Sequence, residues 1–195
     1  MNTMQARLFS REVVPFYLSL IALALATLLC DAALHWIDAV WVGRWLGIPG
    51  VLLILGSLAY SLRKRKLITT GQPATFLRIH EYMAWAGSLL VLVHAGIHFN
   101  AILGWLAVGA MLINVASGLT GKFLLGRARR RLDDARQKMR EVGLSPQELA
   151  ERTYWDSLTF DAVKQWRSVH FPITLAFAVL ALAHIIAVCL FWGWQ

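Results

Sequence analysis

Four histidines lie in two apolar stretches of the chain at matched spacing. His80 and His94 are 14 residues apart in one stretch, and His170 and His184 are 14 residues apart in the other. Fourteen residues of α-helix fall about 40° short of four full turns, so the two histidines of a pair share a helix face about 21 Å apart along the axis. Imidazoles without partners are costly in lipid. The spacing therefore predicts that these side chains bind something between two membrane helices.

Two metal ions, each held by one imidazole from each helix and lying at different depths in the membrane, fit this pattern. Haem iron takes two axial imidazoles from opposite sides of an apolar ring that fills the gap between helices. Zinc needs its ligands within one coordination sphere, which histidines four turns apart do not provide. We therefore predict two haems, with His80 and His170 as axial iron ligands of one and His94 and His184 as those of the other.

Other residues near these histidines are candidates for binding the cofactor. Gly87 lies midway between His80 and His94 on the same face, where a missing side chain admits either a porphyrin or the neighbouring helix. His98, one turn beyond His94, is a candidate propionate partner, quinone contact or interfacial residue. Haem propionates need cations or amides, and the cations at suitable depth are Arg78, Lys122, Arg127 and Arg167 at one end and Arg44 at the other.

The elements that position the histidines are membrane spans. Of the 195 residues 58% are hydrophobic and 15% charged, whereas a soluble domain carries about 25% charged residues. The apolar residues gather in runs of about 20, the length that crosses a hydrocarbon core of about 30 Å. We predict an all-α integral membrane protein, a five-span helical bundle in a single membrane domain over residues 1–195. The spans are expected at approximately 13–34, 46–62, 79–99, 102–124 and 169–192.

Charge placement predicts the orientation of the bundle. With the N-terminus in the cytoplasm, 18 of the 19 Lys and Arg residues are cytoplasmic, and only Arg44 lies outside. This satisfies the positive-inside rule and places the C-terminus in the periplasm. The net charge of +8 then follows from orientation, and we predict no nucleic-acid partner. The expected location is the bacterial cytoplasmic (inner) membrane, as a multi-pass protein.

Two segments have an expected local structure of their own. The run Gly47-Ile48-Pro49-Gly50 predicts that the second span is shortened there or begins with a turn. Residues 125–166 are predicted to form a cytoplasmic basic helical hairpin, with a basic helix over 127–142 and a second helix starting at 145–148. Such a hairpin either lies on the membrane surface or forms a docking surface for a soluble redox partner.

Two His-x13-His pairs on two membrane helices resemble the dihaem b-type transmembrane cytochromes. One branch of these is the cytochrome b family of quinol–cytochrome c reductases. The closer branch is the ferric reductase and NADPH oxidase membrane domain, whose paired histidines also lie on the third and fifth spans. The resemblance rests on His80, His94, His170 and His184, and it implies two b haems stacked between spans three and five. The oxidases continue into a sixth span and an FAD and NADPH domain, whereas this sequence stops at Gln195, so we expect no direct hydride transfer.

The resemblance implies transmembrane electron transfer through two bis-histidine b haems. It implies a cytochrome b subunit of a larger oxidoreductase complex rather than a stand-alone enzyme. The implied partners are membrane lipid, a cytoplasmic iron–sulfur protein or flavoprotein and a periplasmic cytochrome c, with quinone as a further candidate. Two alternatives stay open, namely a self-contained quinol or metal-ion oxidoreductase and, more remotely, a haem-free metal transporter.

Overall fold

The structure, a computed structural model, is almost entirely helical in the residues it describes and has no strand among them. It describes residues 14–97, 102–125 and 154–191, and between the last two ranges only 132–134, 137–138, 141, 143 and 147–148. Within these residues, five segments are long and apolar enough to cross a membrane: Val14–Trp36, Val40–Lys64, Pro73–Ile97, Ile102–Phe123 and Ser168–Phe191. The prediction of an all-α, multi-pass membrane protein with five spans is confirmed at this level.

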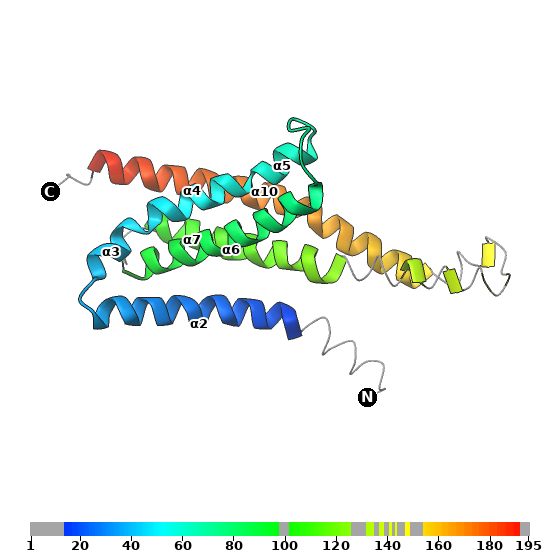
Figure 1. The fold of residues 1–195 in the computed structure, drawn as a ribbon, viewed down its shortest axis with the longest axis horizontal. Coiled ribbons are helices and arrows are strands. Elements are labelled where there is room, and N and C mark those ends of the chain that lie inside the picture. Colours follow the sequence, from blue (N-terminus) through cyan, green and yellow to red (C-terminus); the bar gives the residue numbers. More distant parts are fainter. Residues whose placement is uncertain are drawn as a thin grey trace. The chain divides into compact units, whose positions relative to one another are not determined.

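The second span consists of three short helices in succession (Figure 1). These are α3 (Val40–Trp45), α4 (Gly47–Ser57) and α5 (Ala59–Lys64), which are separated at Leu46 and Leu58. At both breaks the backbone amide reaches the carbonyl three residues earlier, at 3.3 Å for Leu46 and 3.0 Å for Leu58, so each break is a single tightened turn. The span therefore changes its hydrogen-bonding pattern twice within the apolar region.

The predicted turn at Gly47-Ile48-Pro49-Gly50 coincides with the first of these breaks. Helix α4 begins at Gly47, and Pro49 lies in its first turn, where the missing proline N–H has no intrahelical partner to lose. The segment α3 precedes this turn, so the span starts at Val40, earlier than the predicted residue 46.

The remaining spans are α2 (Val14–Trp36), α6 (Pro73–Ile97), α7 (Ile102–Thr120) and α10 (Tyr154–Phe191). Helix α7 continues into a π-helical turn, η2 (Gly121–Leu125).

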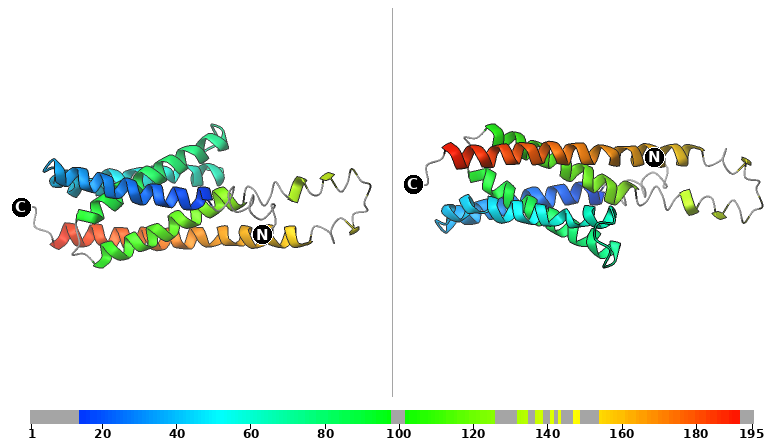
Figure 2. Two further views of the ribbon diagram at one scale, coloured as in Figure 1. Left: turned by 90° about the horizontal axis from the view of Figure 1, so that it is seen from below. Right: turned by 90° about the horizontal axis from the view of Figure 1, so that it is seen from above.

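Two of these helices extend beyond the predicted spans. Helix α6 starts six residues before the predicted residue 79, because Pro73 is well suited to a first helical position. Helix α10 is continuous over 38 residues, so residues 154–166 of the predicted hairpin belong to it (Figure 2). Most of the rest of that hairpin, over 125–153, lies outside the described residues, including 145 and 146 of the helix start expected at 145–148.

Contacts within the chain divide it into two units. The first unit consists of Met1–Ser19 and Ile113–Leu175, and the second of Leu20–Leu112 and Ala176–Gln195. Each unit is described by itself below. The single membrane domain stays a prediction.

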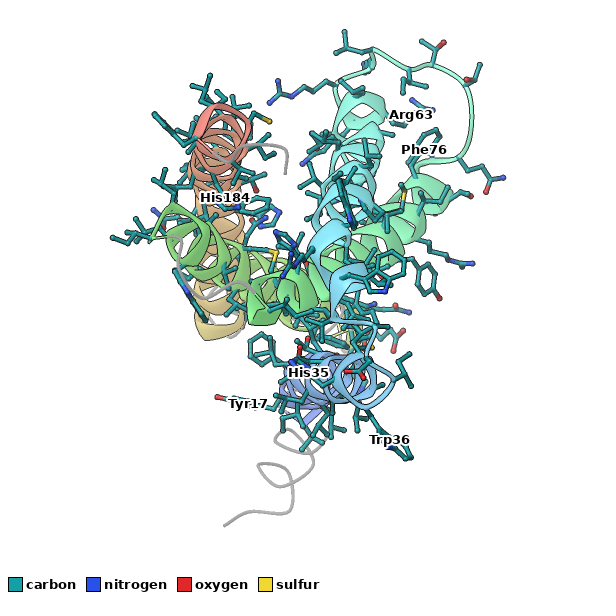
Figure 3. All side chains as sticks on the ribbon, turned by 90° about the vertical axis from the view of Figure 1, so that its left-hand side faces the viewer. Tyr17, His35, Trp36, Arg63, Phe76 and His184 are labelled. Atoms are coloured by element: carbon teal, nitrogen blue, oxygen red, sulfur yellow. The ribbon has the colours of Figure 1, made fainter. Side chains whose placement is uncertain are left out.

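The core of the second unit is small. Ala107, Met111 and Phe177 are buried together, and partly buried apolar side chains from α4, α6, α7 and α10 pack on them. Many large apolar side chains instead face outward, as for Leu29 and Trp36, the latter 91% exposed and pointing away from the helices (Figure 3). In a membrane such residues contact lipid tails, which are as apolar as the side chains themselves.

Helices α4 and α6 cross at two glycines. A Cβ on Gly87 would lie 2.8 Å from the carbonyl oxygen of Gly50 and 2.8 Å from the Ile54 side chain, and a Cβ on Gly50 would lie 3.1 Å from the Gly87 oxygen. Small residues of this kind let membrane helices pack closely. The structure shows the neighbouring helix close to Gly87, and the contact of Gly87 with a porphyrin stays a prediction.

Replacing Gly87 should therefore force α4 and α6 apart. We expect Gly87→Ala to destabilise the protein by about 1–3 kcal/mol, the usual cost of overpacking. The matched control is Gly109→Ala on α7, because nothing lies within 4 Å of a Cβ there and alanine favours helix. Thermal unfolding of both purified variants in detergent, followed by circular dichroism, measures the difference. Equal stability of the two variants would contradict the crossing.

Candidate functional site

His80 of α6 is oriented by the end of α4. Its Nδ1 lies 3.0 Å from the carbonyl oxygen of Ser57, the last residue of α4 before the break at Leu58. The Tyr60 ring packs beside it, with the ring centroids 5.6 Å apart. The imidazole is half-buried, and its orientation is set by one polar contact and one aromatic contact from the second span.

His94, four turns along α6, is held by the other break. Its Nδ1 lies 3.2 Å from the carbonyl oxygen of Gly43 in α3, three residues before Leu46. The ring packs against Gly47, where a Cβ would lie 3.0 Å from Cδ2 and 3.1 Å from Cγ and Nε2. Only glycine at this position leaves the His94 ring where it is.

The two contacts place the proton on the same nitrogen, Nδ1, in both imidazoles. A carbonyl oxygen only accepts hydrogen bonds, so each Nδ1 carries the proton and donates it. In the neutral ring Nε2 is then the nitrogen with a lone pair, the form that binds a metal. Histidines that ligate metals commonly donate their other N–H to a backbone carbonyl in this way. His80 and His94 therefore have the donor chemistry that haem iron requires.

His170 lies in the first unit, on α10, beside α7. Its Nδ1 is 3.2 Å from the hydroxyl of Ser117, which is 3% exposed. Gly118 lies beside the ring, and a Cβ there would make an ordinary van der Waals contact with Cε1, at 3.7 Å. Thr174 Oγ1 lies 2.8 Å from both the His170 carbonyl oxygen and Asn114 Oδ1. These polar contacts join α7 to α10 around the imidazole.

His184 belongs to the second unit, as His94 does. The two imidazoles lie close enough to interact electrostatically. In Figure 3 the His184 side chain is directed from α10 toward the side on which α4 and α6 lie. His94 and His184 thus belong to the same unit, and their pairing as ligands stays a prediction. His80 and His170 belong to different units, and their pairing stays a prediction.

Few other side chains in the described part of the chain join these imidazoles as potential ligands. Across those residues, no three His, Cys, Asp or Glu side chains group together so as to hold a metal ion. A haem needs only two protein ligands per iron. Ligation of haem by two imidazoles stays a prediction.

The remaining candidates have no demonstrated role. Arg78 is exposed on α6, and Arg44 is exposed on α3. Lys122 of η2 places its ammonium 5.7 Å from the centre of the Phe123 ring. Arg167 belongs to α10, but its side chain lies outside the described part, as do His98 and Arg127 entirely. The propionate and quinone contacts stay predictions.

Sequence reasoning missed the groups that hold the imidazoles. Gly43, Gly47 and Gly50 form a small-residue pattern in the second span, and this signal can indicate a close helix contact. Ser117 has no such signal, since one serine in an apolar span usually bonds its own helix.

Asp31 and His35 were also not connected by sequence reasoning. The Nδ1 of His35 lies 2.9 Å from the Asp31 carbonyl oxygen and 3.7 Å from Asp31 Oδ1. His35 therefore has a local partner on its own helix, α2.

Comparison of the chain with known proteins adds no family assignment. No family model, no curated protein and no solved structure matches it. The likeness to dihaem b-type cytochromes stays a prediction based on the four histidines.

Replacing Gly47 should displace the His94 ring. In Gly47→Ala the added methyl meets three ring atoms at about 3 Å, so we expect the Nδ1 contact with Gly43 to lengthen. The control is Gly56→Ala on the same helix, where the methyl meets only the flexible end of Met83. ¹⁵N NMR of histidine-labelled protein should show one shifted imidazole Nδ1 in the first variant and none in the second. Identical spectra would contradict the contact.

Proposed function

We propose that the chain is a transmembrane electron-transfer protein that holds two b haems through His80, His94, His170 and His184. The observation that carries the proposal is the shared orientation of three of these imidazoles. The Nδ1 atoms of His80, His94 and His170 each face an oxygen on another helix, at 3.0, 3.2 and 3.2 Å. A histidine placed only for packing does not need this repeated arrangement, whereas a metal ligand commonly has it.

The spacing of the histidines supports the same proposal. The two histidines of α6 lie four turns apart on one face, and His170 and His184 repeat this interval on α10. With two imidazoles of the chain on each iron, the bound group would supply one-electron transfer rather than oxygen binding. The chain's own residues orient the ligands and exclude water, and donation from Nδ1 to a carbonyl makes the imidazole a more basic ligand.

The proposal extends to the membrane and the partners. We place the N-terminus in the cytoplasm and the C-terminus in the periplasm of a bacterial inner membrane, because 18 of the 19 Lys and Arg residues then lie inside. The chain acts as the cytochrome b subunit of a larger redox complex. Its electron partners are a cytoplasmic iron–sulfur protein or flavoprotein, a periplasmic cytochrome c and, within the membrane, quinone.

Counting haem is the direct test of this function. We expect the purified chain to contain two non-covalent b haems per polypeptide and to show a b-type redox-difference spectrum. His80→Ala and His94→Ala should each remove one haem, because each takes an axial ligand from a different iron. His35→Ala is the control, since this exposed residue bonds its own helix and should leave both haems in place.

Circular dichroism of the same samples separates loss of haem from loss of fold. A folded wild-type chain without haem would overturn the proposal and favour the metal-transporter alternative. Two haems retained in both ligand variants would overturn the ligand assignment.

The proposed orientation is testable with one pair of cysteines. In a background with Cys30→Ser and Cys189→Ser, Ile37→Cys and Leu67→Cys place thiols in two turns where the native side chains are 68% and 70% exposed. We expect a membrane-impermeant maleimide to label residue 37 on spheroplasts and residue 67 only after the membrane is opened. The reverse pattern would invert the topology.

A further inference from the structure

Ser117 differs from four other hydroxyl residues of the spans in what its side chain contacts. Ser19, Thr27, Ser57 and Thr120 each donate to a carbonyl of their own helix, at 2.7–2.9 Å. This local bond is the usual way in which a hydroxyl is satisfied within a helix. The Ser117 hydroxyl is 3.2 Å from Nδ1 of His170 on another helix, and the residue is nearly fully buried.

We propose that Ser117 is a positioning residue for His170 and that it sets the reduction potential of the haem which His170 ligates. This inference rests on the proposed function. If Nε2 of His170 binds iron, Nδ1 must carry the proton, so the serine oxygen accepts it. The hydroxyl then fixes both the tautomer and the ring orientation of the ligand.

Neighbouring contacts link α7 and α10 beside this hydrogen bond. Thr174, one turn along α10, contacts both the His170 carbonyl and the Asn114 side chain of α7 at 2.8 Å. The His170 ring also lies beside Gly118 of α7, since a Cβ there would be 3.7 Å from its Cε1. The two helix segments are therefore linked immediately beside the serine, and its hydroxyl stays within reach of the imidazole.

The direction of the effect follows from the hydrogen bond. An acceptor at Nδ1–H makes the imidazole a stronger donor to iron, which stabilises the ferric state. His80 and His94 receive this effect from backbone carbonyls, which no substitution removes. At His170 the effect depends on one side chain, that of Ser117. Removing the Ser117 hydroxyl should therefore raise the midpoint potential of one haem and leave that of the other unchanged.

Potentiometric titration of the purified dihaem protein, with EPR of both ferric haems, tests this. We expect Ser117→Ala to shift one midpoint potential upward and to change the EPR g-values of that haem alone. Ser117→Thr keeps a hydroxyl and should restore both. Ser88→Ala is the control, because Ser88 is equally buried, at 2% exposed, but lies on α6 in the second unit.

Each result separates this inference from the proposed function. Unchanged potentials in Ser117→Ala, with two haems present, would overturn the role of Ser117 and leave the cytochrome intact. The same shift in Ser88→Ala, or no rescue by threonine, would show a packing effect and also overturn it. Loss of one haem in Ser117→Ala that threonine restores would support it. A wild-type chain without haem would overturn the proposed function itself.

Discussion

Backbone groups inside a membrane must find hydrogen-bond partners within the protein, and this constraint organises the second and third spans. The second span breaks at Leu46 and Leu58, and a break takes carbonyls of the preceding turn out of the regular i to i+4 pattern. The carbonyls of Gly43 and Ser57 face Nδ1 of His94 and His80, respectively. Each imidazole therefore donates a hydrogen bond to a carbonyl beside a break, and that carbonyl in turn orients the imidazole ring.

The close packing of α4 and α6 at Gly50 and Gly87 allows these hydrogen bonds to form. Along α6, Gly87 lies seven residues, or about two turns, from each histidine, so all three residues face α4. The contact of Gly87 with Gly50 sets the distance between the helix axes. That distance in turn determines whether the imidazoles at either end can reach their carbonyls. One close contact thus controls two hydrogen bonds that lie four turns apart.

The sequence predicted the parts of this arrangement that depend on composition and spacing. Apolar runs of about 20 residues determine the number of spans, and an interval of 14 residues places two histidines on one helix face. It did not predict the break at Leu58, because the preceding Gly56 and Ser57 are residue types that also occur inside unbroken membrane helices. Nor did it predict Ser117, whose contact depends on how two distant segments pack. Gly87 falls between these two cases. Its spacing from the histidines predicted the helix face on which it lies, but the sequence did not predict that Gly50 of α4 packs against it.

The histidines of the two spans are held by different kinds of oxygen, and the difference has a physical consequence. At His80 and His94 the acceptor belongs to the main chain, so its strength is the same whichever side chain occupies that position. These bonds therefore change only when the imidazole moves relative to the main chain of the second span, as a methyl at Gly47 would cause at His94. At His170 the acceptor is a hydroxyl, which rotates and is present only in certain residue types. The third span therefore supplies imidazoles held by main-chain oxygens that every sequence contains, whereas the fifth supplies His170, whose contact depends on the side chain of a single residue. If these imidazoles ligate haem as proposed, a change at that residue would alter one reduction potential and leave the contacts between the second and third spans in place.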